Sequence, residues 1–400
     1  MKEVSLLEPV FFNDFKCTGS ACREHCCKGW NIILDKPTVK NYLNSKHPDI
    51  RAIAKDNIIK TKKSYAHWGK IRFSQQGDCA FMDEERLCRI HSVLGASELS
   101  PTCANYPRIK KVTRYEVRQT LTLSCPEAVK NLLLNSDAML LRERTLLRAR
   151  GFSAPALNQE TRFINLLCSH ILLSCGPHVQ QGLYGIAQLF LCLDKQENDP
   201  EKYAKTEAYA LSVIHAFESG EIQTCLDNIK PDYRLQWQLL LRLLAYLRQK
   251  RAARGGATWE RYADRLYAML TDMQDEGDVH AFMQRLDRVW KENVLPWLVE
   301  RPHIMRNYMQ YRLYSDGFPA LNTPGNLASL YFLTAEWFLV KSLLAACAEQ
   351  QGAMTEDDMI NIIYSYHSLT KHDRLSEQAF LDEIDKGKVN DDLSLIYLLT

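Results

Sequence analysis

The sequence lacks a glycine-rich loop between a strand and a helix, the device by which many enzymes bind a nucleotide phosphate. Arg254-Gly255-Gly256 lies between two helical patterns and predicts only a turn. A serine nucleophile elbow, G-x-S-x-G, is absent as well. These absences exclude the usual methyltransferase, kinase, dehydrogenase and serine-hydrolase sites, so any nucleotide-like cofactor must be held by another device.

The N-terminal residues also lack the charged flank, apolar run and small-residue cleavage site of a secretory signal. We therefore expect a cytoplasmic protein, in which thiols stay reduced. From Phe163 to Leu193 no residue is charged apart from any protonated histidine, but Gly176-Pro177 interrupts this run. Each piece is shorter than the roughly 20 residues that cross a bilayer. The run predicts two buried helices joined by a turn, in a soluble protein without a membrane partner.

The formal net charge of +2 is unevenly distributed. Residues 1–130 hold 22 Lys and Arg against 14 Asp and Glu, and residues 131–400 hold 28 against 34. A basic segment can indicate nucleic acid binding. Here the basic clusters, such as Lys62-Lys63 and Lys110-Lys111, are short and no nucleic-acid module surrounds them. We expect no nucleic acid partner.

Cysteine, by contrast, is abundant and clustered. Eight of the thirteen cysteines lie in the first 125 residues, at Cys17, Cys22, Cys26, Cys27, Cys79, Cys88, Cys103 and Cys125. In a cytoplasmic protein such clusters more often bind metal than form disulfides, so these eight are the candidate metal ligands. The other five, Cys168, Cys175, Cys192, Cys225 and Cys347, lie in apolar helical patterns and are expected to fill the core.

The spacing does not identify the metal, because all-sulfur ligand sets suit both zinc and iron–sulfur clusters. Eight thiols exceed the four that one zinc ion or one cubane cluster needs, so one centre or two are possible. Cys26 and Cys27 can bind a single centre only if the backbone turns sharply, which Gly29 would ease. His25 or His91 could replace one thiolate.

The local patterns predict a mainly α protein, with an irregular cysteine-rich domain over residues 1–130. Asp35-Lys-Pro37 predicts the start of a helix that runs to about Leu43. Residues 77–91 predict two extended pieces around a charged turn, and residues 101–107 a loop between prolines. Residues 112–123 alternate as in a small β-hairpin.

Ser124 is predicted to cap the next helix, with Cys125 at its first position, where the helix dipole favours a thiolate. Beyond it nearly every segment has helical periodicity. We therefore expect an all-helical domain over residues 131–350 and a small acidic helical segment over residues 351–400.

The motifs resemble a known family. Cys17 to Trp30, Cys79-Ala-Phe-Met, Cys88-Arg-Ile-His91, Cys103-Ala-Asn-Tyr-Pro107 and Ser124-Cys125-Pro126 are similar to the eight-cysteine, zinc- or iron-chelating family. With its length and helical C-terminal part, the chain resembles the larger branch of that family, the flagellin lysine N-methylases of enteric bacteria. The resemblance implies methylation of flagellin lysines by S-adenosylmethionine, with a [4Fe–4S] cluster in the cysteine domain and zinc as the alternative.

Two mechanisms stay open. The pattern C-x3-C-x2-C of radical S-adenosylmethionine enzymes is met only by Cys22-x3-Cys26, since the next thiol is Cys27. A cluster with an open iron could anchor the amino and carboxylate groups of the methyl donor. Alternatively the metal is structural, and a neutral lysine displaces the methyl group directly, with Tyr106, Tyr115 or Asp83 as a candidate base. The sequence identifies neither the catalytic residues nor those that bind the methyl donor.

Other classes also fit the thiols. The protein could be a metal-chelating scaffold or a redox sensor that transfers no methyl group. The oligomeric state cannot be deduced from the sequence.

Overall fold

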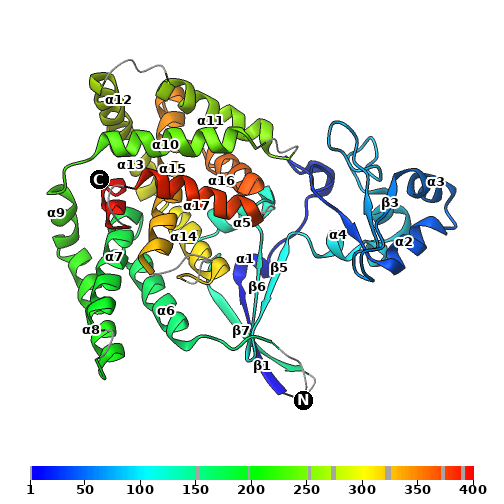
Figure 1. Cartoon of the computed structure of the whole chain (residues 1–400), viewed down its shortest axis with the longest axis horizontal. Coiled ribbons are helices and arrows are strands. Elements are labelled where there is room, and N and C mark those ends of the chain that lie inside the picture. Colours follow the sequence, from blue (N-terminus) through cyan, green and yellow to red (C-terminus); the bar gives the residue numbers. More distant parts are fainter. Residues whose placement is uncertain are drawn as a thin grey trace.

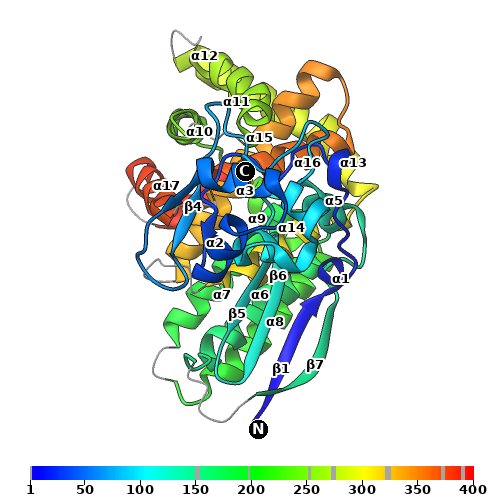
Figure 2. The same cartoon turned by 90° about the vertical axis from the view of Figure 1, so that its right-hand side faces the viewer.

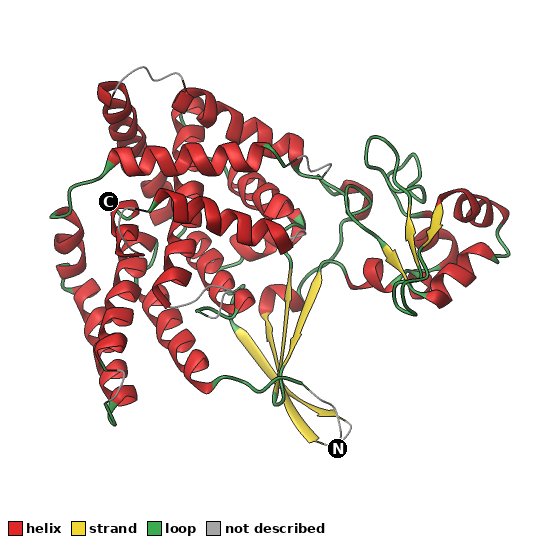
Figure 3. Ribbon diagram, viewed as in Figure 1, coloured by secondary structure: helices red, strands yellow, loops and turns green. Residues whose placement is uncertain are grey.

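The structure, a computed structural model, consists of a large helical body and a smaller lobe that projects from one side (Figure 1). It describes residues 2–148, 154–196, 199–250, 254–271, 276–319, 326–370, 374–388 and 392–400. We call residues 16–106 the cysteine lobe, because they hold seven of the eight N-terminal cysteines. The predicted mainly α fold is confirmed (Figure 3), but the strands form two sheets instead of one hairpin, and β7 (Leu141–Arg148) lies in the segment expected to be all helical.

The cysteine lobe is built from short elements around a small sheet. Its antiparallel strands have the order β2-β4-β3. The strands are β2 (Ile33–Leu34), β3 (Ile58–Lys60) and β4 (Gly69–Ile71), and the helices are η1 (Gly19–Ala21), α2 (Lys36–Leu43), α3 (Pro48–Asn57), η2 (Ile90–Leu94), η3 (Ala96–Glu98) and α4 (Pro101–Asn105). Leu34, Tyr42 and Phe81 are among the buried residues of its own apolar core.

Two predictions about the lobe have different outcomes. Helix α2 begins as predicted, since the Asp35 carboxylate accepts a hydrogen bond from the Thr38 amide at 2.9 Å. The loop predicted over residues 101–107 is wrong. Pro101 instead occupies the first turn of α4, a position where its missing N–H is harmless, and the Ser100 side chain accepts a hydrogen bond from the Cys103 amide.

Removal of the α2 cap provides a local test. We expect Asp35→Ala to destabilise α2 by about 1 kcal/mol, because the Thr38 amide loses its acceptor. Faster amide hydrogen exchange across residues 36–43 would report this loss. Asp56→Ala is a matched control, because Asp56 is exposed near the end of α3. Equal exchange in the two variants would contradict the assigned role of Asp35.

A four-stranded sheet joins the N-terminus to the body. Its order is β5-β6-β1-β7, with β1 parallel to β6 and antiparallel to β7. The strands are β1 (Lys2–Pro9), β5 (Arg108–Val112), β6 (Glu116–Leu121) and β7 (Leu141–Arg148). The predicted hairpin corresponds to β5 and β6, which pair antiparallel. Strand β5 follows α4 directly, so it carries the chain from the lobe into the body (Figure 1).

The body contains the remaining helices. They are α1 (Val10–Asn13), α5 (Pro126–Leu134), α6 (Gln159–Ser174), α7 (Val179–Lys195), α8 (Lys202–Glu218), α9 (Glu221–Asp227), α10 (Tyr233–Arg248), α11 (Gly256–Thr271), α12 (Glu276–Val289), η4 (Trp290–Val294), α13 (Leu295–Val299), α14 (His303–Asp316), α15 (Asn326–Gln351), α16 (Glu356–Thr370), α17 (Arg374–Gly387) and η5 (Asp392–Leu398). The uncharged run forms α6 and α7, as predicted.

Helix α15 is the longest helix of the body. Among the described residues it is also the one helix long and apolar enough to span a membrane by length and composition. Its apolar window is fully buried in the protein, against α7, α11, α12 and α16. Burial on this scale is typical of the central helix of a helical domain.

Most of the buried apolar residues form one large core in the body and a separate core in the lobe. One large core extends from Phe11 and Phe15 in the N-terminal segment through Leu121 and the helices to Leu399. The lobe core is separate. Residues near both chain ends therefore pack into the body, while the domain boundaries at residues 130 and 350 stay predictions.

Candidate metal centre

The fold divides the eight candidate ligands into two groups. Cys26, Cys27, Cys79, Cys88 and Cys103, all in the lobe, are close enough to affect one another's ionisation, and we call them the five-thiol group. Cys17, Cys22 and Cys125 interact in the same way and form the three-thiol group. All thirteen cysteines are free thiols. That all eight bind metal stays a prediction.

Backbone pairing brings Cys27 beside Cys79. The Cys79 amide donates to the Cys27 carbonyl at 2.9 Å, and the Gly29 amide donates to the Gly77 carbonyl at 2.8 Å. Gly29 has a φ of +74°, which L-residues with side chains rarely adopt. The glycine that could ease a turn beside Cys26-Cys27 thus has the positive φ that such a turn requires.

A second turn brings Cys88 into the same group. The residues 77–91 contain an antiparallel bridge between Met82 and Cys88, which matches the predicted extended pieces. The Asp83 carboxylate closes the turn by accepting a hydrogen bond from the Leu87 amide at 2.7 Å. Asp83 therefore holds this turn, and its assignment as a candidate base stays a prediction. Cys103 arrives from α4.

The five-thiol group contains two acidic thiols. The Cys27 side chain lies within hydrogen-bonding reach of both Cys26 and Cys88, and this contact lowers the pKa of Cys88 to about 6 and of Cys26 to about 7. Burial raises the pKa of Cys79 to about 12 and of Cys103 to about 11. Acidic thiols beside buried ones favour a bound cation, which would then replace the protons of the neighbouring thiols.

The donor set fits a thiophilic metal in type and number. Five thiols from four segments supply the four that a zinc ion or a cubane cluster requires. In the part of the chain that the structure describes, no three Cys, His, Asp or Glu side chains already converge as ligands of one ion. Binding would therefore reorient thiols that the backbone has already gathered.

Cys125 differs from its prediction. It is the N-cap of α5, one residue before the helix, in the position predicted for Ser124. The Ser124 hydroxyl instead hydrogen-bonds the Tyr106 and Thr122 hydroxyls. Burial outweighs the dipole and raises the pKa of Cys125 to about 12. A thiolate at Cys125 would thus require a cation beside it.

Two family descriptions match this chain. The FliB lysine N-methylase C-terminal domain matches residues 165–398, more than half of the chain. The chain belongs to the FliB lysine N-methylase family. A zinc- or iron-chelating domain with the pattern CxxCxxCC matches residues 16–126, which include all eight N-terminal cysteines.

Relatives agree with this membership. The chain is 35% identical to a lysine-N-methylase of Salmonella typhimurium and 34% identical to one of Salmonella choleraesuis, over the full length of each protein. It is 52% identical over 145 residues to the flagellar biosynthetic protein FliU of Salmonella muenchen, which covers 36% of this chain and 86% of FliU. No solved structure matches the chain.

In this FliB-family protein the lobe contacts the helical body beside the thiols. Arg23 forms an ion pair with Asp357 of α16 at 2.9 Å, and the Glu24 carboxylate accepts a hydrogen bond from the Gly255 amide at 3.1 Å. Gly255 lies in the predicted turn and has a φ of +72°. Arg254, next to it, is 4% exposed. The contacts hold Cys22 and Cys26 against the body.

Sequence reasoning missed Arg254 as a site residue of the FliB-family protein. Its guanidinium lies 4.9 Å from the centroid of the Tyr106 ring and 6.0 Å from that of Trp30. After the Cys27 hydrogen bond, the Arg254 charge further lowers the pKa of Cys26. Arginine in a turn between helices carries no signal of such a role, since its partners lie more than a hundred residues away.

The structure of the FliB-family protein also places the other candidate base residues and the candidate histidine ligands. Tyr106 is packed between Trp30 and Arg254, and burial raises its pKa, so its hydroxyl stays protonated at neutral pH and is a poor base. Tyr115 is exposed in the β5–β6 turn. His25 is half-buried, and burial lowers its pKa, while the His91 backbone hydrogen-bonds Cys88. Both histidines therefore lie near the thiols.

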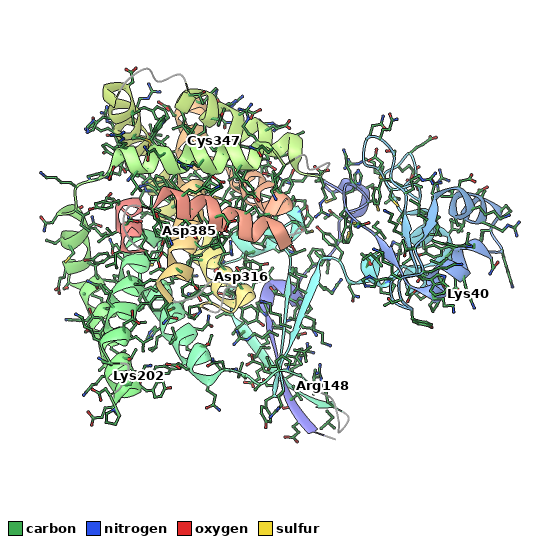
Figure 4. All side chains as sticks on the ribbon, in the orientation of Figure 1. Lys40, Arg148, Lys202, Asp316, Cys347 and Asp385 are labelled. Carbon is green, nitrogen blue, oxygen red and sulfur yellow. The ribbon has the colours of Figure 1, made fainter. Side chains whose placement is uncertain are left out.

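The five cysteines outside the N-terminal set all fall in the helical part of the FliB-family chain. Cys168, Cys175 and Cys347 are buried, as predicted for core residues, and Cys192 and Cys225 are half-buried. Figure 4 places Cys347 in the body, well apart from Lys40 in the lobe. These thiols supply matched controls for the candidate ligands.

Proposed function

We propose that this protein transfers methyl groups from S-adenosylmethionine to lysine ε-amino groups of flagellin in the cytoplasm, with a [4Fe–4S] cluster in the cysteine lobe. The observation that carries the reaction class is the full-length match to lysine-N-methylases. The relatives FliU and FliV, flagellar biosynthetic proteins, support a flagellar substrate. The five-thiol group supports the cluster, since it offers more thiolates than a cubane requires.

The cluster would be held by three of Cys26, Cys27, Cys79, Cys88 and Cys103, because a fourth thiolate would occupy the last iron. When bound, it would supply an open iron that can ligate the amino and carboxylate groups of the methyl donor, and a source of one electron. The Trp30 indole N–H donates to the Cys26 carbonyl, and the buried Arg254 lies over the Trp30 and Tyr106 rings. A cation and two aromatic rings therefore lie beside the exposed Cys26.

Direct methyl transfer requires a neutral lysine amine. A lysine amine with a pKa of about 10.4 is protonated at neutral pH and has no lone pair to donate. The lone pair must be freed before the N–C bond forms and the C–S bond of the donor breaks. Arg254 beside the thiols would favour the neutral amine, because a nearby like charge disfavours the ammonium form.

The decisive experiment combines two measurements on protein purified without oxygen. We expect about four iron and four sulfide per chain, and transfer of label from methyl-labelled S-adenosylmethionine to lysines of purified flagellin. Zinc without sulfide would refute the cluster. Full metal content without any transfer of label would refute the methylase and favour a chelating scaffold, or a redox sensor if mild oxidation reversibly releases the metal.

A further inference from the structure

A cavity of about 340 Å³ lies where the cysteine lobe meets the body. Its wall comes from three places: Trp30 and the α4–β5 segment of the lobe, the strands β5 and β6, and the C-terminal end of α14. Figure 2, in which the lobe faces the viewer, shows these strands running down from it. The cavity volume lies in the range of about 300–1,000 Å³ that suits small-molecule ligands.

One wall of the cavity is aromatic and adjoins the five-thiol group. The Trp30 and Tyr106 rings lie 5.2 Å apart between centroids. The Trp30 indole N–H donates to the Cys26 carbonyl at 2.6 Å. Thr102 and Asn105, which also line the cavity, flank Cys103 in α4. A ligand against this wall would be separated from the thiols by little more than one layer of side chains.

The other walls carry charge of both signs. Arg108 and Lys111 of β5 provide two cations. Asp316, labelled in Figure 4, provides a carboxylate at the end of α14, where Arg312 holds it at 2.7 Å. Thr122 adds a hydroxyl group to the lining. The cavity thus combines an aromatic surface, an anion-binding side and a fixed carboxylate.

We propose that this cavity binds the methyl donor, an adenosyl sulfonium amino acid. The inference rests on the proposed function and assigns its donor site. The Trp30 and Tyr106 rings stack on the adenine or face the sulfonium, as aromatic faces do with bases and cations. Asp316 accepts hydrogen bonds from the ribose hydroxyls, while Arg108 and Lys111 donate to the oxygen of the amino-acid carboxylate that an iron would leave unligated.

A larger cavity is a poorer fit. It has a volume of about 530 Å³ and lies between α7, α8 and η5, on the side of the body away from the lobe (Figure 1). Its lining includes Tyr184 and Tyr209, but it has no carboxylate and lies far from the eight cysteines. The cavity at the lobe therefore suits the donor better than this larger cavity does.

Binding of S-adenosylhomocysteine, the unreactive demethylated form of the donor, tests the assignment by isothermal titration calorimetry on the metal-loaded full chain. Loss of one stacking ring is worth about 1–3 kcal/mol, so Trp30→Ala should weaken binding about 5- to 150-fold. Arg108→Gln should weaken it about 3- to 10-fold, because one charge-assisted hydrogen bond is lost. Arg108 is exposed and lies in β5, outside the cysteine lobe.

Two matched variants serve as controls. Trp68 lies in the same lobe under the Lys36 ammonium at 4.4 Å, outside the cavity. Lys110 lies on the same strand as Arg108 but does not line the cavity. Trp68→Ala and Lys110→Gln should bind S-adenosylhomocysteine like the unmodified protein. Iron content is measured on every variant, so that loss of the cluster is separated from loss of the ligand.

The outcomes are distinct. Weaker binding by Arg108→Gln and Trp30→Ala, with both controls unchanged, supports the assignment. Unchanged binding by both cavity variants overturns it and leaves the methylase function intact. Unchanged binding with a raised KM for flagellin also overturns it, and would assign the cavity to the substrate lysine. No binding by the unmodified protein would refute the donor itself, and the proposed function with it.

Discussion

A Cys88→Ser variant is expected to lose most of its bound metal and, with it, methyl transfer. Cys88 is the most acidic thiol of the five-thiol group, with a pKa of about 6, and it contacts Cys27 directly. Removal of residues that merely support a metal ligand already costs about 10- to 100-fold in affinity or activity. Loss of a ligand should cost more, so iron per chain should fall at least about 10-fold.

The matched control for Cys88→Ser is Cys192→Ser. Cys192 is half-buried in α7 and accepts a hydrogen bond from the Gln196 side chain, which a serine oxygen can also accept. The Cys192→Ser variant should retain both its bound metal and its methyl-transfer activity. If Cys88→Ser kept full iron and sulfide, the five-thiol group would not be the metal centre.

Cys17→Ser in the same assay separates one centre from two. Cys17 is exposed and belongs to the three-thiol group. If the protein holds one centre in the five-thiol group, its metal content should stay near that of the unmodified chain. Loss of about half the metal would instead indicate a second centre built on Cys17, Cys22 and Cys125, since three thiolates can hold a metal with one open position.

The chemistry of the site was predictable where it depends on local sequence. Four thiols within eleven residues predict a shared metal site, and Gly29 beside them adopts the positive φ that a turn of the backbone requires. Asp35 and Pro37 fix the start of α2 for the same local reason. A short stretch of sequence is enough in each case, because the interacting atoms are only a few residues apart.

Predictions failed where long-range packing decides. Strand β1 pairs with β6 across more than a hundred residues, and its partner β7 is mostly exposed and charged, so neither has a clear strand signal. Cys125 was expected to be acidic at a helix start, but it is buried against the body, and burial outweighs the dipole. The cavity at the lobe likewise combines residues from both halves of the chain.

The body fixes that cavity through a buried ionic network. Glu336 of α15 is 2% exposed, and its carboxylate forms an ion pair with Arg312 of α14, itself 1% exposed. The Tyr308 and Tyr366 hydroxyls each donate to the same carboxylate at 2.8 Å. Arg312 also holds Asp316, which lines the cavity. The buried Glu336 carboxylate is therefore satisfied by one ion pair and two hydrogen bonds, and the Arg312 guanidinium by two carboxylates.

Loss of the carboxylate should be strongly destabilising. Breaking a buried ion pair costs about 3–5 kcal/mol, because the remaining charge stays buried with too few partners. We expect Glu336→Ala to lower the free energy of unfolding by about that amount, and to weaken binding in the cavity, since Arg312 and α14 lose an anchor. Urea titration followed by circular dichroism measures the first effect.

The control for Glu336→Ala is Glu300→Ala, which breaks an exposed ion pair. Glu300 pairs with Arg301 at 3.0 Å near the surface, with the Glu300 side chain 74% exposed. Exposed pairs contribute about 0–1 kcal/mol, because water already solvates both charges. A loss as small as this in Glu336→Ala would mean that Asp316 alone satisfies Arg312. In that case α14, and the cavity wall that it carries, would be held by apolar packing and not by the ion pair.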